Sequence, residues 1–345
     1  MAPTIQAIVE EARYKWIIDN IIENHQSLKW EWSHLSLNEN ITWDMIQAYP
    51  EKPWDWICVS MNPNITPGII EANLNKPWCW YNVSKNPRIT FKFVLKHRNR
   101  RWRWDWIALS SHPAITWENI MDHPHLPWRY DYAGMNKNVT LDIILAHPEI
   151  DWDWSKVSSN PNITWEDVTA HMDKPWEWNL ISSHQNIKWD VLNMDPLPPQ
   201  IAPIAWLWWL GVSQNPNITW DIIKNNLDKP WNWTQLSNHP CITIEIIRTH
   251  FSRDLWRRLN VTQNPNMTLD IVKANSDLHW TWFFLSSNPS VTRMPAVQVE
   301  HMARRYFAAR KIQHGLLAAY YNPEYLLCQN RLRRECESMA FDLTA

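Results

Sequence analysis

The feature that most constrains this chain is a phrase of about 24 residues that returns along most of its length. Stretches such as 62–66 and 215–219 read Asn-Pro-Asn-Ile-Thr, and alignment on the last residue of that phrase gives nearly constant spacing. Self-similarity at a fixed period of this size is typical of a solenoid or a related array. The aligned residues are Thr42, Thr66, Thr90, Thr116, Thr140, Thr164, Lys188, Thr219, Thr243, Thr268 and Thr292.

The pattern of residues within each unit predicts two short helices. The Thr is an N-cap, and an acidic residue two positions later, such as Asp44, suits the positive end of a helix. Ile41 before the cap and Ile46 after it form a hydrophobic staple. A Lys-Pro-Trp junction then starts the second helix, with Pro in its first turn, and this segment ends at the next Asn-Pro.

The tryptophans predict how the units pack. An isolated helix of two turns is marginal in water, so neighbouring units must stack into one core. Most of the 28 tryptophans recur in pairs, and a residue that recurs in every unit is better explained as a spacer between layers than as a ligand contact. The pairs are Trp54 and Trp56, Trp78 and Trp80, Trp152 and Trp154, Trp176 and Trp178, Trp231 and Trp233, and Trp280 and Trp282.

We therefore predict an all-α fold, a solenoid of about eleven 24-residue repeats that each hold an α-helix and a second short α or 3-10 segment. Residues 1–29 and 293–345 form helical caps, and residues 30–292 form the solenoid. Layers stacked at roughly 8–10 Å predict a rod or superhelix on the order of 100 Å long.

Two families share these motifs. The order Ser-x-Asn-Pro-Asn-Ile-Thr, then an acidic residue and two aliphatics, resembles the leucine-rich repeat variant family, which implies a right-handed superhelix of α and 3-10 segments. The NPNITWDII and KPWxW units, with the C-terminal stretch AARKIQ…YYNPEYLLCQNRLRRE, are similar to tryptophan-rich short-repeat proteins of giant DNA viruses. This second resemblance runs from about Trp30 to Glu335 and implies a viral product and a virion component, without an activity.

A basic interruption breaks the period near residues 96–103, where two residues are added. Insertions in solenoids usually map to loops on one face, often the binding face. Arg98, Arg100, Arg101 and Arg103 either form a solvated loop or contact phosphates or an acidic partner.

An aromatic interruption adds seven residues within 194–210. Its prolines disfavour a regular helix, and Trp206, Leu207 and Trp208 offer more apolar surface than one unit needs. This insertion is a hinge between two sub-arrays or an exposed docking loop. We predict that partner contacts concentrate at the two interruptions, with the tryptophans as the stronger anchors.

No pattern in the chain points to catalysis. Only four glycines are present, so phosphate-binding loops are missing, and the acidic residues recur at helix starts, where they have a structural role. His97, His123, His147 and His171 share one position with Asn73 of another unit, which predicts a helix-ending role. Like residues spaced by whole repeats do not converge on a metal, so we predict no enzyme activity, cofactor or metal.

Composition favours an intracellular protein. The formal net charge of −2 gives no global attraction to nucleic acid or to anionic lipid. Five scattered cysteines without a Cys-x-x-Cys pair argue against a disulfide framework. The N-terminus lacks a secretory signal, and the longest apolar stretch, 201–212, is too short to span a bilayer. If the chain is viral, the host cytoplasm or the virion is the expected location.

These observations lead to one preferred function and two alternatives. The preferred function is a non-enzymatic scaffold that binds other macromolecules, chiefly through protein–protein contacts. The first alternative is a nucleic-acid-binding solenoid that uses the basic loop at 96–103 and the C-terminal arginines. The second alternative is an enzyme. The identity of a protein partner and the oligomeric state are not written in the sequence.

Overall fold

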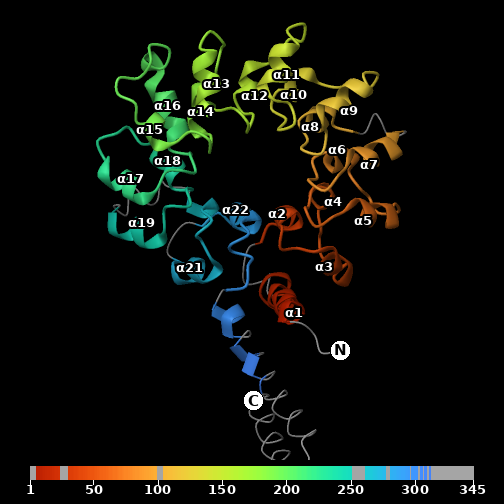
Figure 1. Ribbon diagram of the computed structural model, residues 1–345. Coiled ribbons are helices and arrows are strands. Elements are labelled where there is room, and N and C mark those ends of the chain that lie inside the picture. Colours follow the sequence, from red (N-terminus) through yellow and green to blue (C-terminus); the bar gives the residue numbers. More distant parts are fainter. Residues whose placement is uncertain are drawn as a thin grey trace, which may run out of the picture. The chain divides into compact units, whose positions relative to one another are not determined.

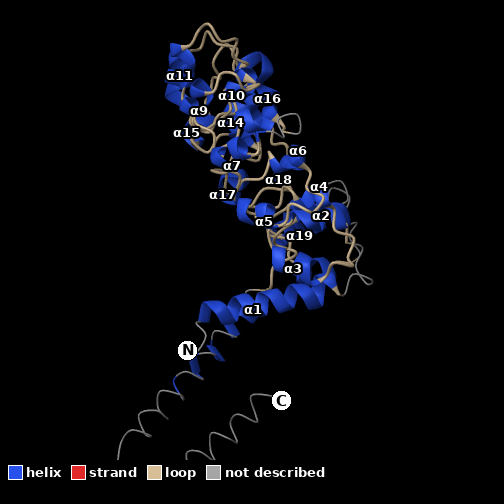
Figure 2. Ribbon diagram, turned by 90° about the vertical axis from the view of Figure 1, so that its right-hand side faces the viewer, coloured by secondary structure: helices blue, strands red, loops and turns tan. Residues whose placement is uncertain are grey.

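The computed structural model describes residues 5–23, 30–98, 104–250, 261–276, 280–295, 297–301, 304–305, 307–308 and 311. Every regular element in these ranges is a helix (Figure 2), which confirms the predicted all-α solenoid. The chain forms two compact units: residues 24–293 make up one, and residues 1–23 with 294–345 make up the other. The boundaries predicted for the terminal caps, and their capping role, stay predictions.

The first helix of each repeat starts after the Thr of the recurring phrase. Thr66 Oγ accepts the Ile69 N–H at 3.3 Å, and Thr164 forms a capping box with Asp167. These bonds satisfy backbone donors that have no partner within the helix. The first helices are α3 (Trp43–Ala48), α5 (Pro67–Ala72), α7 (Phe91–Lys96), α9 (Trp117–Asp122), α11 (Leu141–Ala146), α13 (Trp165–Ala170), α15 (Trp189–Leu192), α17 (Trp220–Asn225), α19 (Ile244–His250) and α21 (Leu269–Ala274).

The second helix of most repeats starts at the second tryptophan of the pair, not at the proline; the exceptions start at Tyr130, which replaces that tryptophan, and at Ala205. The prediction that Pro lies in the first turn of the second helix was therefore wrong. The N-cap is the residue between the two tryptophans; in one repeat, for example, Asp55 Oδ1 accepts the Ile57 N–H at 2.8 Å. The second helices are α2 (Trp32–Leu37), α4 (Trp56–Val59), α6 (Trp80–Val83), α8 (Trp106–Ser110), α10 (Tyr130–Ala133), α12 (Trp154–Val157), α14 (Trp178–Ser183), α16 (Ala205–Val212), α18 (Trp233–Leu236) and α22 (Trp282–Ser287), and the 3-10 turn η5 (Val261–Gln263) also follows this register.

The first tryptophan of most pairs stays extended because its indole joins two parts of the chain; Trp30, at the start of the array, is the exception, since its buried Nε1–H has no hydrogen-bond partner. Trp78 is 7% exposed, and its Nε1–H donates to the Asn73 carbonyl at the end of the preceding first helix, at 2.7 Å. Trp152 makes the same bond to the His147 carbonyl at 3.0 Å. A buried indole N–H needs such an acceptor. The tryptophans are therefore core spacers, and the Asn or His at the helix end is confirmed as its C-cap.

Neighbouring repeats are joined by a buried side chain that we call the Asn ladder. Asn160 is fully buried, and its Nδ2 donates to the carbonyls of Gly134, Asn136 and Val139 in the preceding repeat at 2.8, 3.1 and 2.7 Å. Its Oδ1 accepts the Asn162 N–H at 3.0 Å. The ladder positions are Asn38, Asn62, Asn86, His112, Asn136, Asn160, His184, Asn215, His239, Asn264 and Asn288.

A buried serine adds a second bond at most of these interfaces. Ser158 Oγ accepts the Glu177 N–H of the next repeat at 2.9 Å and donates to the Trp154 carbonyl of its own repeat at 2.7 Å. The recurring Leu-Ser step thus has a structural role, because one hydroxyl satisfies a backbone group on each side of the interface.

The repeat array closes on itself. The Glu31 N–H of the first repeat donates to Ser286 Oγ of the last repeat at 2.8 Å, the same bond that joins interior repeats. Asn38 Nδ2 donates to the Ser286 carbonyl at 3.0 Å, in the register of the Asn ladder. Trp30 and Trp282 meet edge to face at 5.2 Å between ring centroids.

Figure 1 shows the result, a ring in which second helices such as α2, α4 and α22 lie nearer the centre than first helices such as α3, α5 and α21. The predicted rod or superhelix was wrong. Each repeat is rotated slightly against its neighbour, and the rotation accumulates along a solenoid. Here it brings the last repeat against the first, where the same hydrogen-bonding groups meet.

The second unit contains α1 (Ile5–Ile17), which continues as the π-helix η1 (Ile18–Ile22). Ile17, Ile18, Ile21 and Ile22 are buried. Residues 297–301 are also helical.

Candidate functional site

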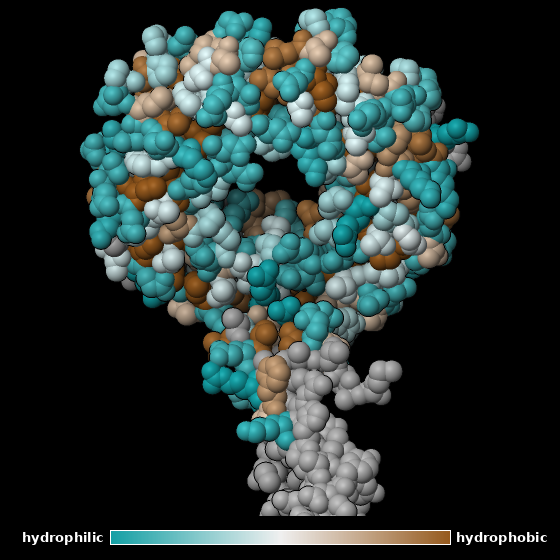
Figure 3. Space-filling model, viewed as in Figure 1, coloured by the Kyte–Doolittle hydropathy of each residue, from teal (hydrophilic) through white to brown (hydrophobic). Residues whose placement is uncertain are grey.

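The repeats surround a central opening (Figure 3). It remains open when side chains are drawn in full, and the residues around it are mostly hydrophilic (Figure 3). The second helices lie nearest to it (Figure 1), and the residue after their second aromatic side chain varies between repeats. Ile57 and Tyr81 are 55% and 51% exposed at this position, whereas Asp131 and Ser155 occupy it farther along the chain.

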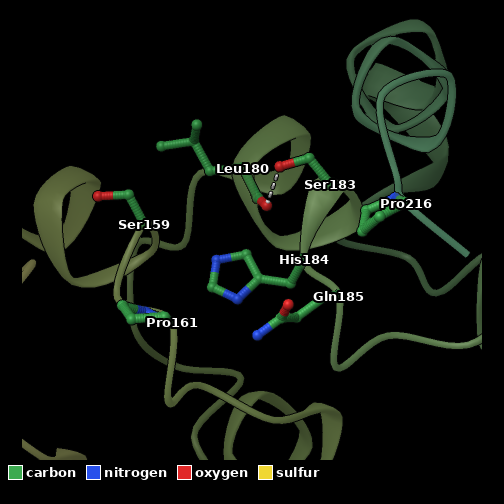
Figure 4. Close-up of a pocket in the computed structure, with 7 residues that line it drawn as sticks. All are labelled: Ser159, Pro161, Leu180, Ser183, His184, Gln185 and Pro216. Atoms are coloured by element: carbon green, nitrogen blue, oxygen red, sulfur yellow. Dashed lines mark hydrogen bonds between the residues drawn. The ribbon is translucent and has the colours of Figure 1, made fainter. Parts of the chain in front are cut away.

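A pocket of about 320 Å³ lies between the turns of three successive repeats. Figure 4 shows Pro161 on one side, Pro216 on the other, and the rings and side chains of the middle repeat between them. The lining residues are Ser159, Pro161, Leu180, Ser183, His184, Gln185 and Pro216. Gln185 stands where the neighbouring repeats have proline, so one of the regular turn prolines is missing at the centre of the pocket.

His184 and the two serines of this pocket are hydrogen-bonded within the fold. Ser183 Oγ donates to the Leu180 carbonyl and Ser159 Oγ to the Lys156 carbonyl, both at 2.7 Å. His184 is a member of the Asn ladder, and its Nε2 meets the Ser158 carbonyl at 2.8 Å. Burial lowers the pKa of His184. The histidine is therefore not paired with a serine as a general base would be, and the pocket offers proline and leucine surface with a few acceptors.

The aromatic interruption is built into the ring. Its residues form a short 3-10 turn, η4 (Ala202–Ile204), followed by α16, which packs closely against α14. Close packing requires Gly211, since a Cβ there would collide with the Asn179 carbonyl. The sequence left two interpretations of this interruption, an exposed docking loop and a hinge. The close contact of α16 with α14 shows that this part of the insertion packs within the stack of repeats.

The three predicted anchors in this interruption have different environments. Trp206 is 67% exposed, and Leu207 is half-buried. Trp208 is fully buried, donates its Nε1–H to the Leu192 carbonyl at 3.1 Å and packs edge to face on Trp165. Prediction of Trp208 as a surface anchor was wrong, because this side chain takes over the indole bond that the first tryptophan of the pair makes in other repeats.

Arg98 is exposed just beyond α7, and Arg100, Arg101 and Arg103 lie outside the described residues. Among the C-terminal arginines, Arg304 is exposed and its guanidinium pairs with the Glu300 carboxylate at 2.6 Å, whereas Arg310, Arg331, Arg333 and Arg334 lie outside the described residues. Lys96 Nζ and His97 Nε2 both contact the Glu71 carboxylate, at 2.8 and 3.3 Å. These bonds hold the pKa of Glu71 below its usual range, and the hydrogen bond from Lys96 has the largest effect.

Cationic side chains lie over exposed or half-buried tyrosines on the second helices. Lys85 Nζ is 4.5 Å from the centre of the Tyr81 ring, and Lys156 Nζ is 5.3 Å from that of Tyr132. Arg129 also lies over Tyr132, while its guanidinium pairs with Asp131 at 2.6 Å. Sequence analysis missed these pairs, because it treated the second helices as core; the only signal was the variation at the positions that follow the second tryptophan.

Within the ranges that the structure describes, no three His, Cys, Asp or Glu side chains gather as a metal site would require. Burial raises the pKa of the Cys58 thiol to about 11 and that of Cys241 to about 12, which disfavours the nucleophilic thiolate at neutral pH. None of the helices placed here has the length and apolar character needed to cross a bilayer.

Comparison with known proteins adds no assignment: no family model, curated protein or solved structure matches this chain.

Proposed function

We propose that the protein is a non-enzymatic ring-shaped scaffold that binds other macromolecules, chiefly proteins. The observation that supports this function most directly is the contrast between the buried and the exposed positions of the repeat. The buried Asn, Ser and Trp positions recur and hold the ring together, whereas exposed positions such as Ile57, Tyr81 and Trp206 differ between repeats. A fold that fixes its core and varies its surface is suited to recognition.

Two surface features give this proposal candidate contacts. Trp206 presents a large aromatic side chain from a packed helix, and rigid exposed aromatics are frequent hot spots of interfaces. The pocket at Leu180 and Gln185 is large enough to receive an apolar side chain of a partner. His184 and both serines of this pocket are already hydrogen-bonded within the ring, which favours binding over catalysis.

The test begins with partner capture from infected or native cells by the full chain. The affinity of each captured protein is then measured against Trp206→Ala, Leu180→Ala and Leu227→Ala. Leu227 is 62% exposed on the ring and serves as the matched apolar control. We expect the first or the second variant to weaken binding at least tenfold, about 1.4 kcal/mol, and the control to bind like the parent. Parental binding by all three variants would contradict these contact sites.

The alternative function is nucleic-acid binding, and the lysines and tyrosines of the second helices favour it. Cationic grooves with aromatic platforms suit single strands. Under this alternative, Lys156→Ala and Arg98→Ala lower the affinity for a single-stranded oligonucleotide, and affinity falls steeply as salt is raised. Binding of a protein partner through Trp206 is salt-tolerant, so one titration at two salt concentrations separates the two functions.

The resemblance to giant-virus repeat proteins extends the proposal to a viral origin and a place in the virion. Mass spectrometry of purified particles and of infected-cell cytoplasm tests both locations. Recovery of the chain from cytoplasm but not from particles would reject the virion role without affecting the scaffold function.

A further inference from the structure

Three histidines occupy positions of the Asn ladder. His112, His184 and His239 are 5%, 9% and 5% exposed, and each lies at the interface with the preceding repeat. The other ladder positions hold Asn, which joins the repeats by the same hydrogen bonds but has no titratable group.

The histidine rings reproduce the hydrogen bonds of the asparagine amide. Nε2 of His112 meets the Asn86 carbonyl at 3.0 Å, and Nε2 of His239 meets the Asn215 carbonyl at 3.0 Å, where Asn would donate through Nδ2. Nδ1 of His112 accepts the Ala114 N–H at 3.1 Å, where Asn would accept through Oδ1. Nδ1 of His239 accepts the Cys241 N–H at 3.2 Å in the same way.

These bonds fix the protonation state. A ring nitrogen that accepts a backbone N–H carries no proton, so in His112 and His239 Nδ1 is bare and Nε2 carries the single proton of a neutral imidazole. His184 shares only the Nε2 contact, to the Ser158 carbonyl. A second proton would have to enter at Nδ1, where it would face the donor N–H and break that bond. An asparagine at the same position has no proton to gain, so its interface is insensitive to acid.

The charges around the three rings do not favour the protonated form. Lys137 acts on His112 and opposes a second positive charge there. For His184 and His239, burial is the main influence and lowers the pKa, and the backbone carbonyls that contact the rings offset part of this lowering. The Cys241 thiol lies 2.9 Å from Nδ1 of His239 and stays neutral, because burial raises its pKa to about 12.

We propose that the interfaces at His112 and His239 are acid-sensitive joints, at which the ring loosens as the pH falls from about 7 toward 5. This inference concerns the integrity of the ring and does not rest on the proposed binding function. Asparagine interfaces remain closed, so loosening begins at the joints before His112 and His239. The ring would therefore hold its shape at neutral pH and open a defined set of interfaces in an acidic compartment.

The direction in which stability changes with pH follows from proton linkage. Burial lowers the pKa of all three histidines from the ordinary value of 6.5, so the folded protein binds fewer protons than the unfolded chain below that value. Stability is therefore complete above about pH 6.5 and is lost as the pH falls toward the folded-state pKa. Each histidine can lower the folding equilibrium constant by up to about tenfold per pH unit in that window.

The experiment compares the full chain with the triple variant H112N/H184N/H239N by urea unfolding at pH 7.5 and pH 5.0. We expect the parent to lose much more stability at the lower pH than the triple variant does. The matched control is H123N/H147N/H171N, which changes three helix-ending histidines to the residue found in other repeats; it should keep the acid response of the parent. An equal acid response in the parent and in H112N/H184N/H239N would overturn the proposal.

Amide hydrogen exchange provides a second readout that needs no variant. Protonation of Nδ1 releases the N–H groups of Ala114 and Cys241, so these amides should exchange faster at pH 5.0, after correction for intrinsic rates, than those of Asn64 and Asn162 at asparagine joints. Equal protection at both kinds of joint would also overturn the proposal, whether or not the triple variant folds.

Discussion

Replacement of Asn160 by alanine tests the ladder on which the fold depends. The side chain makes four hydrogen bonds, three from Nδ2 to carbonyls of the preceding repeat at 2.7 to 3.1 Å and one from the Asn162 N–H to Oδ1 at 3.0 Å. Alanine would remove the side-chain partner of the Gly134 and Val139 carbonyls and of the Asn162 N–H, whereas the Asn136 carbonyl keeps its bond from the Val139 N–H. Since the two N–H groups of Nδ2 are shared among three carbonyls, we count three bonds, and at about 1 kcal/mol for each the expected loss is about 3 kcal/mol.

Two further variants make this prediction specific. Asn162→Ala removes one exposed bond, from Nδ2 to the Lys137 carbonyl, and should cost about 1 kcal/mol or less. Asn160→His should cost much less than Asn160→Ala at pH 7.5, because His112 and His239 make equivalent bonds from ladder positions. Urea unfolding followed by tryptophan fluorescence and circular dichroism measures all three. A loss for Asn160→Ala below about 1 kcal/mol, or a histidine variant as unstable as the alanine variant, would refute the reasoning.

Three other predictions address the ring and its core. Ser286→Ala at the closing interface and Ser84→Ala at an interior one remove equivalent acceptors, so both should cost about 1 kcal/mol in thermal or urea unfolding; a neutral Ser286 variant beside a destabilised Ser84 variant would mean that the ring is open in solution. Gly211→Ala should prevent close packing of α16 on α14 and destabilise by several kcal/mol, as differential scanning calorimetry would show. Gly68→Ala should be neutral or stabilising in the same assay, because a Cβ there meets only Thr66 Oγ1 at 3.8 Å, near the start of α5. Trp178→Ala, at a buried spacer, should cost about 3–5 kcal/mol in the same assay, and a parental melting temperature would contradict its role in the core.

The local parts of this architecture are predictable because their causes lie within a few residues. Thr66 caps α5 through a bond to a residue three positions away, and the order of Thr, acid and aliphatics is visible in the sequence. The 24-residue period likewise predicts that repeats stack, because no unit can bury its apolar face alone. The helix-ending role of His147 and its equivalents follows from the exchange of His for Asn at one register.

Candidate site residues were harder to predict, because their environment depends on contacts across repeats. In the sequence, Trp206 and Trp208 are two members of one aromatic run. In the structure, one is 67% exposed and the other fully buried, since the insertion and Gly211 bring α16 against α14 and turn Trp208 into a core spacer. The ladder function of His112 is hidden for the same reason: its partner, the Asn86 carbonyl, lies 26 positions earlier in the chain.

The sequence by itself determined the helical repeat, the Thr residues that cap its first helices and its tryptophan core, because these follow from the spacing and chemistry of residues within one unit and its neighbour. Tertiary structure alone decided that the array closes. Closure depends on a small rotation at every interface, summed over the whole array, and no local pattern records that sum. Only when the first and last repeats meet do Glu31 and Asn38 find Ser286, and a solenoid that could have ended in two open edges becomes a ring.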